Sequence, residues 1–175
     1  AIYTTRPEPK QWELIGQYLP KKPVPIQYVS RDVLTKMVGT TDHQSVVAWV
    51  QTFPFRKKTF EAHKHPFLLV LDSIQDPRNL GAILRSAYCT GVSGVIISSK
   101  YSAPLTAVAL KSAAGLAEHL EIQVVSNTQQ LLAQLKSNYH LLLAALGGKE
   151  LKDCHTTLPL CLVIGNEAIG ISKSL

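Results

Sequence analysis

From residue 67 onward, short apolar runs alternate with helical patterns. Residues 67–71 form an uninterrupted apolar run, typical of a strand buried on both faces of a parallel sheet. Residues 79–90 follow with apolar side chains at helical spacing. The same alternation predicts strands at 92–98, 122–126, 139–145 and 160–164, and helices at 105–119 and 128–138. We therefore expect an α/β fold, with a mostly parallel sheet flanked by helices on both faces.

The first part of the chain predicts a smaller α/β unit. Its patterns indicate strands at 2–5, 24–29 and 45–50, and helices at 9–19 and 31–38. Ser30 fits the N-cap of the second helix, and Gly39 ends it. Residues 54–66 break all periodicity, which indicates a linker. The expected organisation is a small α/β domain at 1–53, a linker at 54–66 and a larger domain at 67–175.

Composition and charge narrow the class of protein. Of the 175 residues, 46% are hydrophobic and 17% charged, which excludes intrinsic disorder. The longest apolar run, 141–146, is far shorter than the ~20 residues of a membrane-spanning helix. Three cysteines without C-x-x-C spacing predict no zinc site, no disulfide framework and a reducing, cytoplasmic setting.

Positive charge is concentrated in the first 66 residues. They contain ten Lys and Arg against five Asp and Glu, whereas residues 67–175 contain eight against seven. The net charge of +6 is therefore almost entirely carried by the first part. This asymmetry indicates an anionic partner such as RNA, although ordinary solvated lysines would give the same count.

The common signatures of nucleotide and hydrolytic enzymes are missing. Gly91-x-x-Gly94 is only a fragment of the dinucleotide motif, and residues 147–150 lack the spacing and the hydroxyl residue of a P-loop. No serine lies in a G-x-S-x-G elbow, and no histidine pair has metal-ligand spacing on a helix. Kinases, dinucleotide oxidoreductases, serine hydrolases and metalloenzymes are therefore disfavoured.

Two loops that follow apolar strands carry unusual polar residues, at the end of a parallel sheet where ligands bind. The first, 72–81, places Asn79 where a helix begins, with Arg85 six residues further on. The second, Gly165-x-Glu167-x-x-Gly170, lets backbone approach a ligand beside one carboxylate. From the pattern alone, Asn79 could also be a helix N-cap, Arg85 a surface arginine and the second loop a simple glycine turn.

Together these loops resemble the motifs of a known enzyme family. Asp76-Pro77-x-Asn79-x-Gly81-Ala82-Ile83-x-Arg85-Ser86-Ala87 is similar to the first motif of the SpoU (TrmH-like) RNA 2'-O-ribose methyltransferases of the SPOUT class. Leu162-Val163-Ile164-Gly165-x-Glu167-x-x-Gly170 resembles their second motif, and residues 111–118 resemble the helix between them. Residues 29–34 and 43–44 resemble the small substrate-binding domain of members that modify guanosine in large-subunit rRNA.

The resemblance implies a fold, a cofactor and site residues. It implies a SPOUT catalytic domain with a trefoil knot, a homodimer, and S-adenosyl-L-methionine as the cofactor. By position in the motifs, Arg85 activates the ribose 2'-hydroxyl, Asn79 helps to hold the site and Glu167 orients the catalytic loop. The implied cofactor-binding residues are Leu146, Gly147, Ile164, Gly165, Asn166 and Gly170. The expected RNA-binding residues are Arg56, Lys57, Lys58, Arg78 and Lys111.

Aromatic side chains are interleaved with the basic residues of the linker. Phe53, Phe55 and Phe60 could stack on unpaired bases, but the favoured interpretation is that they anchor the linker against one domain. The lysines and arginines of this region would bind phosphates with little sequence choice and a steep salt dependence.

Three departures from the family pattern qualify these expectations. The third motif of the family would follow Leu175, so we expect residues 1–175 alone to have an incomplete knot, weak cofactor binding and little activity. Ala168 and Ser45 each replace a glycine that is usual at that place. The leading hypothesis is 2'-O-methylation of a guanosine in large-subunit rRNA. The alternatives are a tRNA 2'-O-methyltransferase, or a non-catalytic RNA-binding protein that retains the fold.

Overall fold

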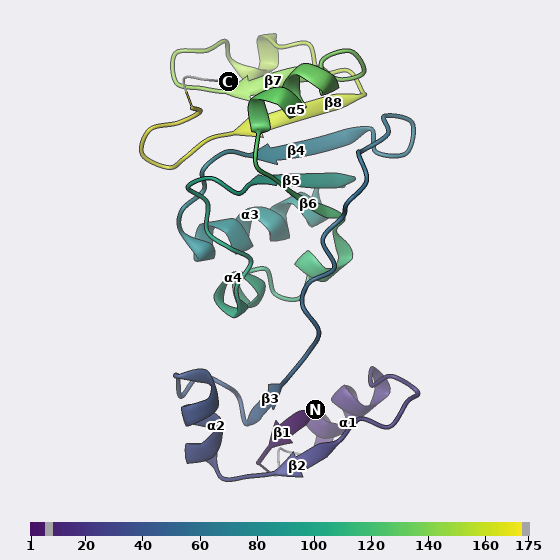
Figure 1. Ribbon diagram of the computed structural model, residues 1–175, viewed down its shortest axis with the longest axis vertical. Helices are drawn as coiled ribbons and strands as arrows, with labels where there is room; N and C mark the ends of the chain where they lie inside the picture. The colour runs from purple at the N-terminus through teal and green to yellow at the C-terminus, as the bar shows by residue number, and fades with distance from the viewer. Residues whose placement is uncertain (6–8, 173–175) are drawn as a thin grey trace. The chain divides into compact units, whose positions relative to one another are not determined.

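The computed structural model describes residues 1–5 and 9–172, and the chain divides into two compact units, Ala1–Thr52 and Phe53–Leu175 (Figure 1). Each unit contains its own sheet. Within the described residues, no helix is both long and apolar enough to cross a membrane.

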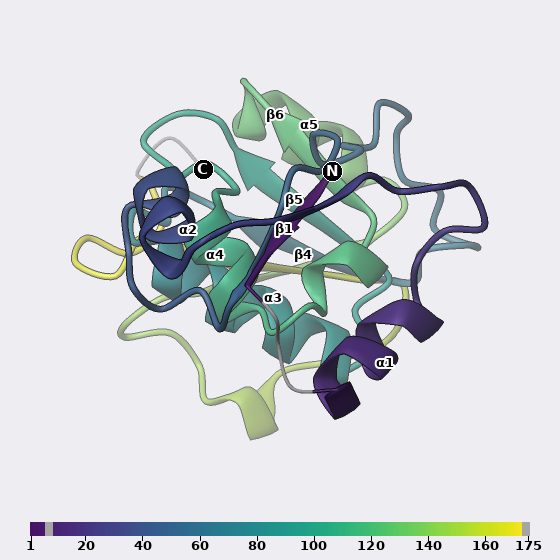
Figure 2. The ribbon, with the colours of Figure 1, turned by 90° about the horizontal axis from the view of Figure 1, so that it is seen from below.

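The first unit is built on a three-stranded sheet in the order β2-β1-β3. Strand β1 (Ile2–Thr4) pairs in parallel with β2 (Ile26–Tyr28) and antiparallel with β3 (Val46–Ala48). Helices α1 (Pro9–Gln17) and α2 (Arg31–Val38) lie on opposite sides of β1 (Figures 1 and 2). All five elements were expected from the sequence, but the strands are shorter than the apolar patterns that predicted them.

Helix α2 begins and ends at the residues that the sequence indicates. The Ser30 side chain accepts a hydrogen bond from the Val33 N–H, and Gly39 ends the helix at a φ of 70°. Leu34 is fully buried, and α2 packs against β1 and β3. The local sequence and the tertiary packing therefore select the same helix.

A strained turn connects α2 to β3. His43 is buried, and its Nδ1 accepts the N–H of Ser45 at 3.1 Å. The carbonyl of Ser45 accepts bonds from the Thr5 N–H and the Thr4 hydroxyl, at 3.1 and 2.9 Å. These bonds hold Ser45 at a φ of 67°, in the left-handed region that favours glycine. The glycine usual after His43-Gln44 thus has a physical reason, and Ser45 occupies a strained position.

The second unit contains a five-stranded sheet in the order β6-β5-β4-β8-β7. Its strands are β4 (Phe67–Leu71), β5 (Gly94–Ser98), β6 (Ile122–Val125), β7 (His140–Ala144) and β8 (Leu160–Ile164). Every adjacent pair is parallel. The predicted fold class, a mostly parallel sheet flanked by helices, is confirmed.

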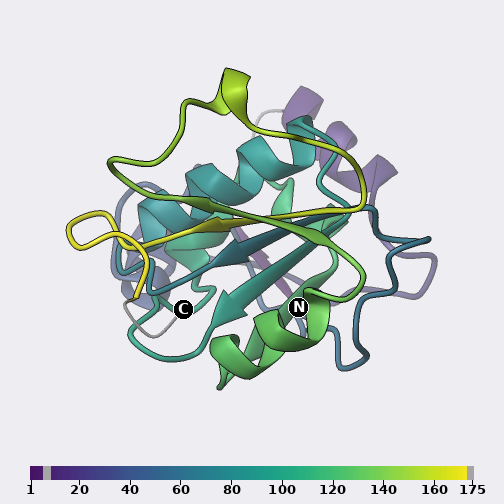
Figure 3. The same cartoon turned by 90° about the horizontal axis from the view of Figure 1, so that it is seen from above.

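Helices cover both faces of this sheet, as Figure 3 shows for α3 and α5. Helices α3 (Pro77–Cys89) and α4 (Ala107–Ser112) contribute to the core on one face, and α5 (Thr128–Leu135) to the core on the other. Alternate residues of β4 enter the two cores, Leu69 and Leu71 on the α3 side and Leu68 and Val70 on the α5 side. Burial on both faces explains why β4 contains no polar residue.

The predicted helix at 105–119 is wrong in its extent. Helix α4 ends at Ser112, and only the 3-10 turn Ala117–His119 follows. Between them, Ala114 and Gly115 adopt φ values of 52° and 79°, which no α-helix accommodates. The apolar spacing continued through this region, but the backbone reverses there.

The predicted linker at 54–66 contains no helix or strand, yet it packs against the second unit. Phe60 is only 7% exposed and belongs to the core on the α5 side. A Cβ atom on Gly94 would lie 2.3 Å from the Phe60 ring, so β5 admits that ring only because residue 94 is glycine. The aromatic residue therefore anchors the segment, which is the interpretation that the sequence favoured for its phenylalanines.

Polar contacts hold the same segment at the amino ends of the strands. The Arg56 guanidinium pairs with Glu121 and lies 4.8 Å from the centroid of the Phe60 ring. His65 is buried, and its carbonyl accepts the Tyr139 hydroxyl at 3.0 Å. Burial raises the pKa of Tyr139 to about 12, so this hydroxyl remains a donor. The segment is therefore a fixed part of the second unit rather than a free connector.

We predict that Ser45→Gly stabilises the first unit by about 1 kcal/mol, because glycine removes the left-handed strain at no cost in side-chain contacts. Both tryptophans, Trp12 and Trp49, lie in this unit, so their fluorescence during urea unfolding reports on it alone. Ser30→Gly is the control, since Ser30 has a φ of −73° and caps α2. That control should lose a few tenths of a kcal/mol. A lower midpoint for Ser45→Gly would contradict the strain argument.

Candidate active site

The order of the parallel strands defines where a ligand site is expected. From β4 the chain continues to β5 and β6 on one side, and β8 and β7 lie on the other. The strand order therefore reverses between β4 and β8, and ligands of open parallel sheets bind at the carboxyl ends of such a pair. The two motif loops leave the sheet at this point. The Asp72 N–H donates to the Ile164 carbonyl at 2.8 Å, which continues the pairing beyond the strand ends.

The loop after β8 is a closed glycine turn, visible at the end of that strand in Figure 3. Asn166 and Gly170 exchange backbone hydrogen bonds at 2.9 and 3.0 Å. A Cβ atom on Gly165 would lie 2.2 Å from the carbonyl carbon of Gly170, and Gly170 has a φ of 72°. Both glycines are therefore required by the turn itself. The alternative that the sequence left open, a simple glycine turn, describes the backbone correctly. It does not account for the hydrogen bonds that the side chains of Asn166 and Glu167 make to the other loop.

The buried amide of Asn166 joins the two motif loops. Its Nδ2 donates to the Ser73 carbonyl at 2.8 Å, and its Oδ1 accepts the N–H groups of Ala168 and Ile169 at 2.9 and 3.1 Å. The side chain is 8% exposed. The resemblance implies that Asn166 lines the cofactor pocket, and this role stays a prediction. In the structure the Asn166 side chain holds the loop onto the end of β4.

Helix α3 begins at Pro77, two residues before the predicted start. Asp76 is its N-cap and accepts the Arg78 N–H at 2.7 Å, so Asn79 is not the cap. Asn79 instead donates from Nδ2 to Oε1 of Glu167 at 2.9 Å. An ionised carboxylate only accepts, which fixes the orientation of the Asn79 amide and leaves its Oδ1 facing away from Glu167. Two predicted site residues, 88 positions apart, are thus in contact.

The Asn79 hydrogen bond is the main reason that the pKa of Glu167 is lowered. Burial opposes this shift, and backbone N–H groups of Glu167, Gln75 and Asp76 add to it. The Gln75 N–H lies 3.5 Å from Oε2 of Glu167. Glu167 is exposed and remains ionised at neutral pH, so it acts as an acceptor that orients Asn79 and not as a proton donor.

Arg85 and Arg78 project from α3 seven residues apart, which places them on one side of the helix, two turns from each other. Both side chains are exposed and have no ion pair within the described part of the chain. A guanidinium without a protein partner is available to an anion or to a ribose hydroxyl. The prediction that Arg85 is a catalytic residue stays a prediction.

The remaining predicted cofactor residues lie at the neighbouring strand end. Leu146 and Gly147 follow β7, the strand beside β8. The Leu146 side chain is fully exposed, and Gly147 has a φ of 76°. Ile169 is also largely exposed, at 78%. Backbone loops and uncovered apolar side chains thus occur together at the carboxyl ends of β7 and β8.

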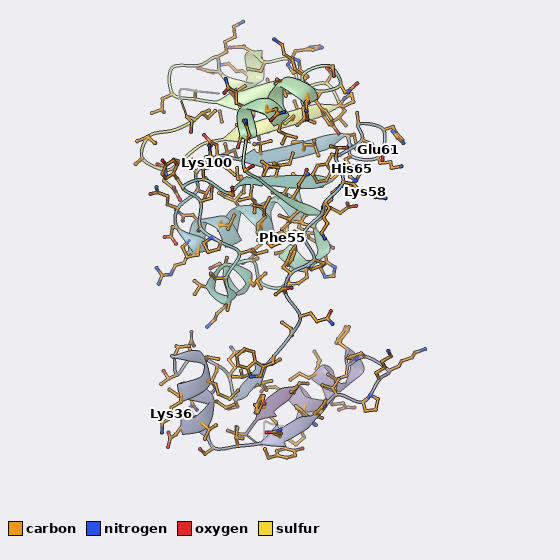
Figure 4. All side chains as sticks on the ribbon, viewed as in Figure 1. Lys36, Phe55, Lys58, Glu61, His65 and Lys100 are labelled. Carbon is orange, nitrogen blue, oxygen red and sulfur yellow. The ribbon has the colours of Figure 1, made fainter. Side chains whose placement is uncertain are left out.

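The predicted RNA-binding residues do not form one surface. Arg56 is occupied by Glu121 and by the carbonyls of Lys58 and Thr59. Lys58 lies at the amino ends of the strands, near Glu61 and His65 in Figure 4. Arg78 lies at the opposite edge, at the start of α3. Lys111, in the last turn of α4, has an interaction of its own.

Sequence reasoning did not select Asp72 and Ser73 as site residues, although they directly follow the apolar run of β4. Asp72 is 4% exposed, and its Oδ2 accepts the Ser172 N–H at 2.8 Å. Ser73 has a φ of 61°. A carboxylate directly after a buried strand was the available signal. No cluster of metal-ligating side chains occurs among residues 1–5 and 9–172.

The fold and this geometry define an α/β domain whose candidate ligand site lies at the point where the strand order reverses. The chain belongs to the SpoU rRNA methylase family, whose model matches residues 66–175.

Relatives support this assignment. YacO, a TrmH family protein of Bacillus subtilis (strain 168), is 33% identical over 161 residues, covering 87% of this chain and 64% of YacO. The 23S rRNA (guanosine-2'-O-)-methyltransferase RlmB of Haemophilus influenzae is 34% identical over 156 residues, covering 85% of this chain and 63% of the relative. The chain therefore spans a little under two thirds of both proteins.

Among solved structures, the SpoU methyltransferase AviRb of Streptomyces viridochromogenes has a TM-score of 0.75 at 22% identity, covering 99% of this chain and 66% of AviRb. AviRb has also been solved in complex with its cofactor AdoMet, with a TM-score of 0.74. At this level of identity the likeness establishes the fold.

We predict that Asn79→Ala raises the pKa of Glu167 toward the ordinary glutamate value of about 4.3, because the main hydrogen bond to the carboxylate is lost. When folding lowers the pKa of a carboxyl group, that group stabilises the folded protein at every pH above its ordinary pKa. This stabilisation is lost as the pH falls through the lowered pKa. The measurement is an NMR titration of the Glu167 side-chain carbon. Asn138→Ala, an exposed asparagine, is the control. An unchanged pKa in Asn79→Ala would contradict the coupling.

Proposed function

We propose that this protein is an S-adenosyl-L-methionine-dependent RNA 2'-O-ribose methyltransferase that acts on a guanosine of large-subunit rRNA. The observation that carries the proposal is the Asn79–Glu167 hydrogen bond, which joins the two family motifs where the strand order reverses. Family membership and the activity in the name of the RlmB relative support the same reaction.

The residues at the strand ends fit the proposed cofactor. Gly147, which has open space where a Cβ atom would lie, allows main-chain atoms to approach a ligand. The uncovered side chains of Leu146 and Ile169 offer apolar contact to an adenine ring. When bound, S-adenosyl-L-methionine supplies an electrophilic methyl group. Ile164 and Gly170 would line the cofactor site through their backbone.

The reaction requires positioning of a ribose hydroxyl and removal of its proton. With Nδ2 held by Glu167, Oδ1 of Asn79 can accept the 2'-hydroxyl and orient its oxygen. Arginine is a poor general base at neutral pH, because its pKa exceeds about 12. We assign Arg85 an electrostatic role, in which its guanidinium stabilises the negative charge that develops on the ribose oxygen as the hydroxyl proton passes to solvent water.

The substrate and the assembly belong to the same proposal. The first 66 residues carry nearly all of the net positive charge, which suits a polyanion. We propose that the protein acts as a homodimer, since Leu143, Leu151 and Ile169 of the second unit expose apolar side chains. All three cysteines are free thiols, which supports a reducing, cytoplasmic setting.

The direct test, on protein that includes the third motif expected after Leu175, is methyl transfer from radiolabelled S-adenosyl-L-methionine to 23S rRNA and to tRNA, followed by mass spectrometry of the ribose product. A 2'-O-methylguanosine in rRNA is expected. Methyl transfer to tRNA alone would show that the substrate is tRNA and not rRNA. RNA binding without transfer would favour the non-catalytic alternative.

We predict that Arg85→Lys lowers kcat about 100-fold while the Kd for the cofactor changes less than about twofold, because the charge remains but the guanidinium fork is lost. Calorimetry with S-adenosyl-L-methionine provides the second measurement. Lys136→Ala, an exposed cation after α5, serves as the control and should retain full kcat. Full activity in Arg85→Lys would remove Arg85 from the catalytic residues.

A further inference from the structure

A polar cavity lies beside the candidate active site, at the carboxyl ends of β4, β5 and β6. Its volume is about 400 Å³, and each of its ten lining residues carries a hydroxyl, amide, carboxylate or ammonium group. Asn79, Arg85 and Glu167 are not among them. Asp72 and Ser73 line the cavity and also adjoin the two motif loops, so these two residues lie between the cavity and the candidate active site.

A hydroxyl in the lining of this cavity has no hydrogen-bond partner within the described part of the chain. Thr128 is 7% exposed and lines the cavity, yet its Oγ1 has no hydrogen bond within the described residues. The Asn127 side chain caps the Gln130 N–H, so the N–H groups of Thr128 and Gln129 also lack an acceptor in that part of the chain. These donors would be satisfied by a ligand with acceptor oxygens.

Lys100 and Tyr101 add a cation and an aromatic ring to the lining of the cavity. Lys100 has no anionic partner among the described residues, and Figure 4 shows its side chain at the edge opposite Lys58. Tyr101 is 81% exposed and has a φ of 54°. Ser98 holds this turn by donating to the Lys100 carbonyl and accepting the Lys100 N–H, both at 3.3 Å. An exposed ring on a strained backbone is held in place at an energetic cost.

We propose that this cavity binds a nucleotide of the RNA substrate that flanks the methylated one. Lys100, the Thr128 hydroxyl and the first turn of α5 receive its phosphate, and its base stacks on Tyr101. A phosphate only accepts hydrogen bonds, which matches a group of unpaired donors, and stacking tolerates any base. The identity of this ligand rests on the proposed function.

The position of Ser73 between the cavity and the motif loops explains how this binding would help to place the substrate. The Ser73 carbonyl accepts the Asn166 amide at 2.8 Å, and Asn166 fixes the loop that carries Glu167. A nucleotide held in the cavity would therefore be positioned against the same rigid strand ends as the reacting ribose. Its contribution belongs to substrate binding, so it acts on KM and not on kcat.

The test uses the ¹⁵N-labelled full chain and 5'-GMP, with guanosine, inorganic phosphate and S-adenosyl-L-methionine titrated separately. The amide signals of residues 98–102 and 126–129 should shift with 5'-GMP. Lys100→Ala and Tyr101→Ala should each weaken its Kd about fivefold or more, whereas Tyr101→Phe retains binding. Lys136→Ala is the control with a distant cation removed.

Two outcomes overturn the inference: shifts confined to residues 165–170, or shifts at 98–102 caused by S-adenosyl-L-methionine and not by 5'-GMP. The methyl-transfer assay separates this inference from the proposed function. Transfer with an unchanged KM for RNA in Lys100→Ala would remove the flanking site alone. Binding of 5'-GMP as described, without transfer to any RNA by protein that includes the third motif, would remove the proposed function and leave a nucleotide-binding cavity.

Discussion

The parallel pairing of β4 with β8 is the constraint on which the site depends. These strands are about 90 residues apart in the chain, and only their pairing brings the two motif loops to one edge. The Asp72–Ile164 hydrogen bond extends the pairing past the strands, and the Asn166 amide then ties one loop to the other. Because both strands are buried on both faces, core packing fixes their register. The register in turn fixes the positions of the two loops relative to each other.

The adjacent side chains of Asn166 and Glu167 in the second loop have different environments and different partners. Asn166 is buried and uses its amide entirely on backbone groups, whereas the adjacent Glu167 is exposed and holds a side chain of the other loop. A buried amide with satisfied bonds gives rigidity, and an exposed carboxylate with a lowered pKa gives a constant negative charge. Exchanging these roles would leave a buried charge without a cationic partner, which is far more costly.

Much of the second unit could be predicted because its signals are local. A strand buried on both faces needs a continuous apolar run, as in β4, and the Asn127 cap marks the start of α5 where it was expected. The errors arose where backbone geometry overrides side-chain pattern. The left-handed Ala114 ends a helix in the middle of helical spacing, and no periodicity reveals it.

The sequence could propose candidate site residues but not their partners. The resemblance to the family motifs pointed to Asn79 and Glu167, whereas the pattern alone also allowed Asn79 to be a helix cap. Only the position of Asp76 one turn earlier decides this, because a helix has one N-cap. In the same way, the sequence grouped Arg56 with Lys58 as RNA contacts. It could not show that Glu121, which is distant in sequence, would pair with Arg56.

The distribution of cations over the second unit has a consequence for RNA binding. Lys58 belongs to a segment held at the amino ends of the strands by Phe60, whereas Arg78, in the first turn of α3, and Lys100 lie at the carboxyl ends. The length of the strands separates these two ends, so a nucleotide bound beside Asn79 and Glu167 could not contact Lys58 at the same time. For such a nucleotide, Lys58 would contribute long-range, salt-sensitive attraction. In the proposed reaction, the ribose would be positioned at the carboxyl ends, where Glu167 holds Asn79.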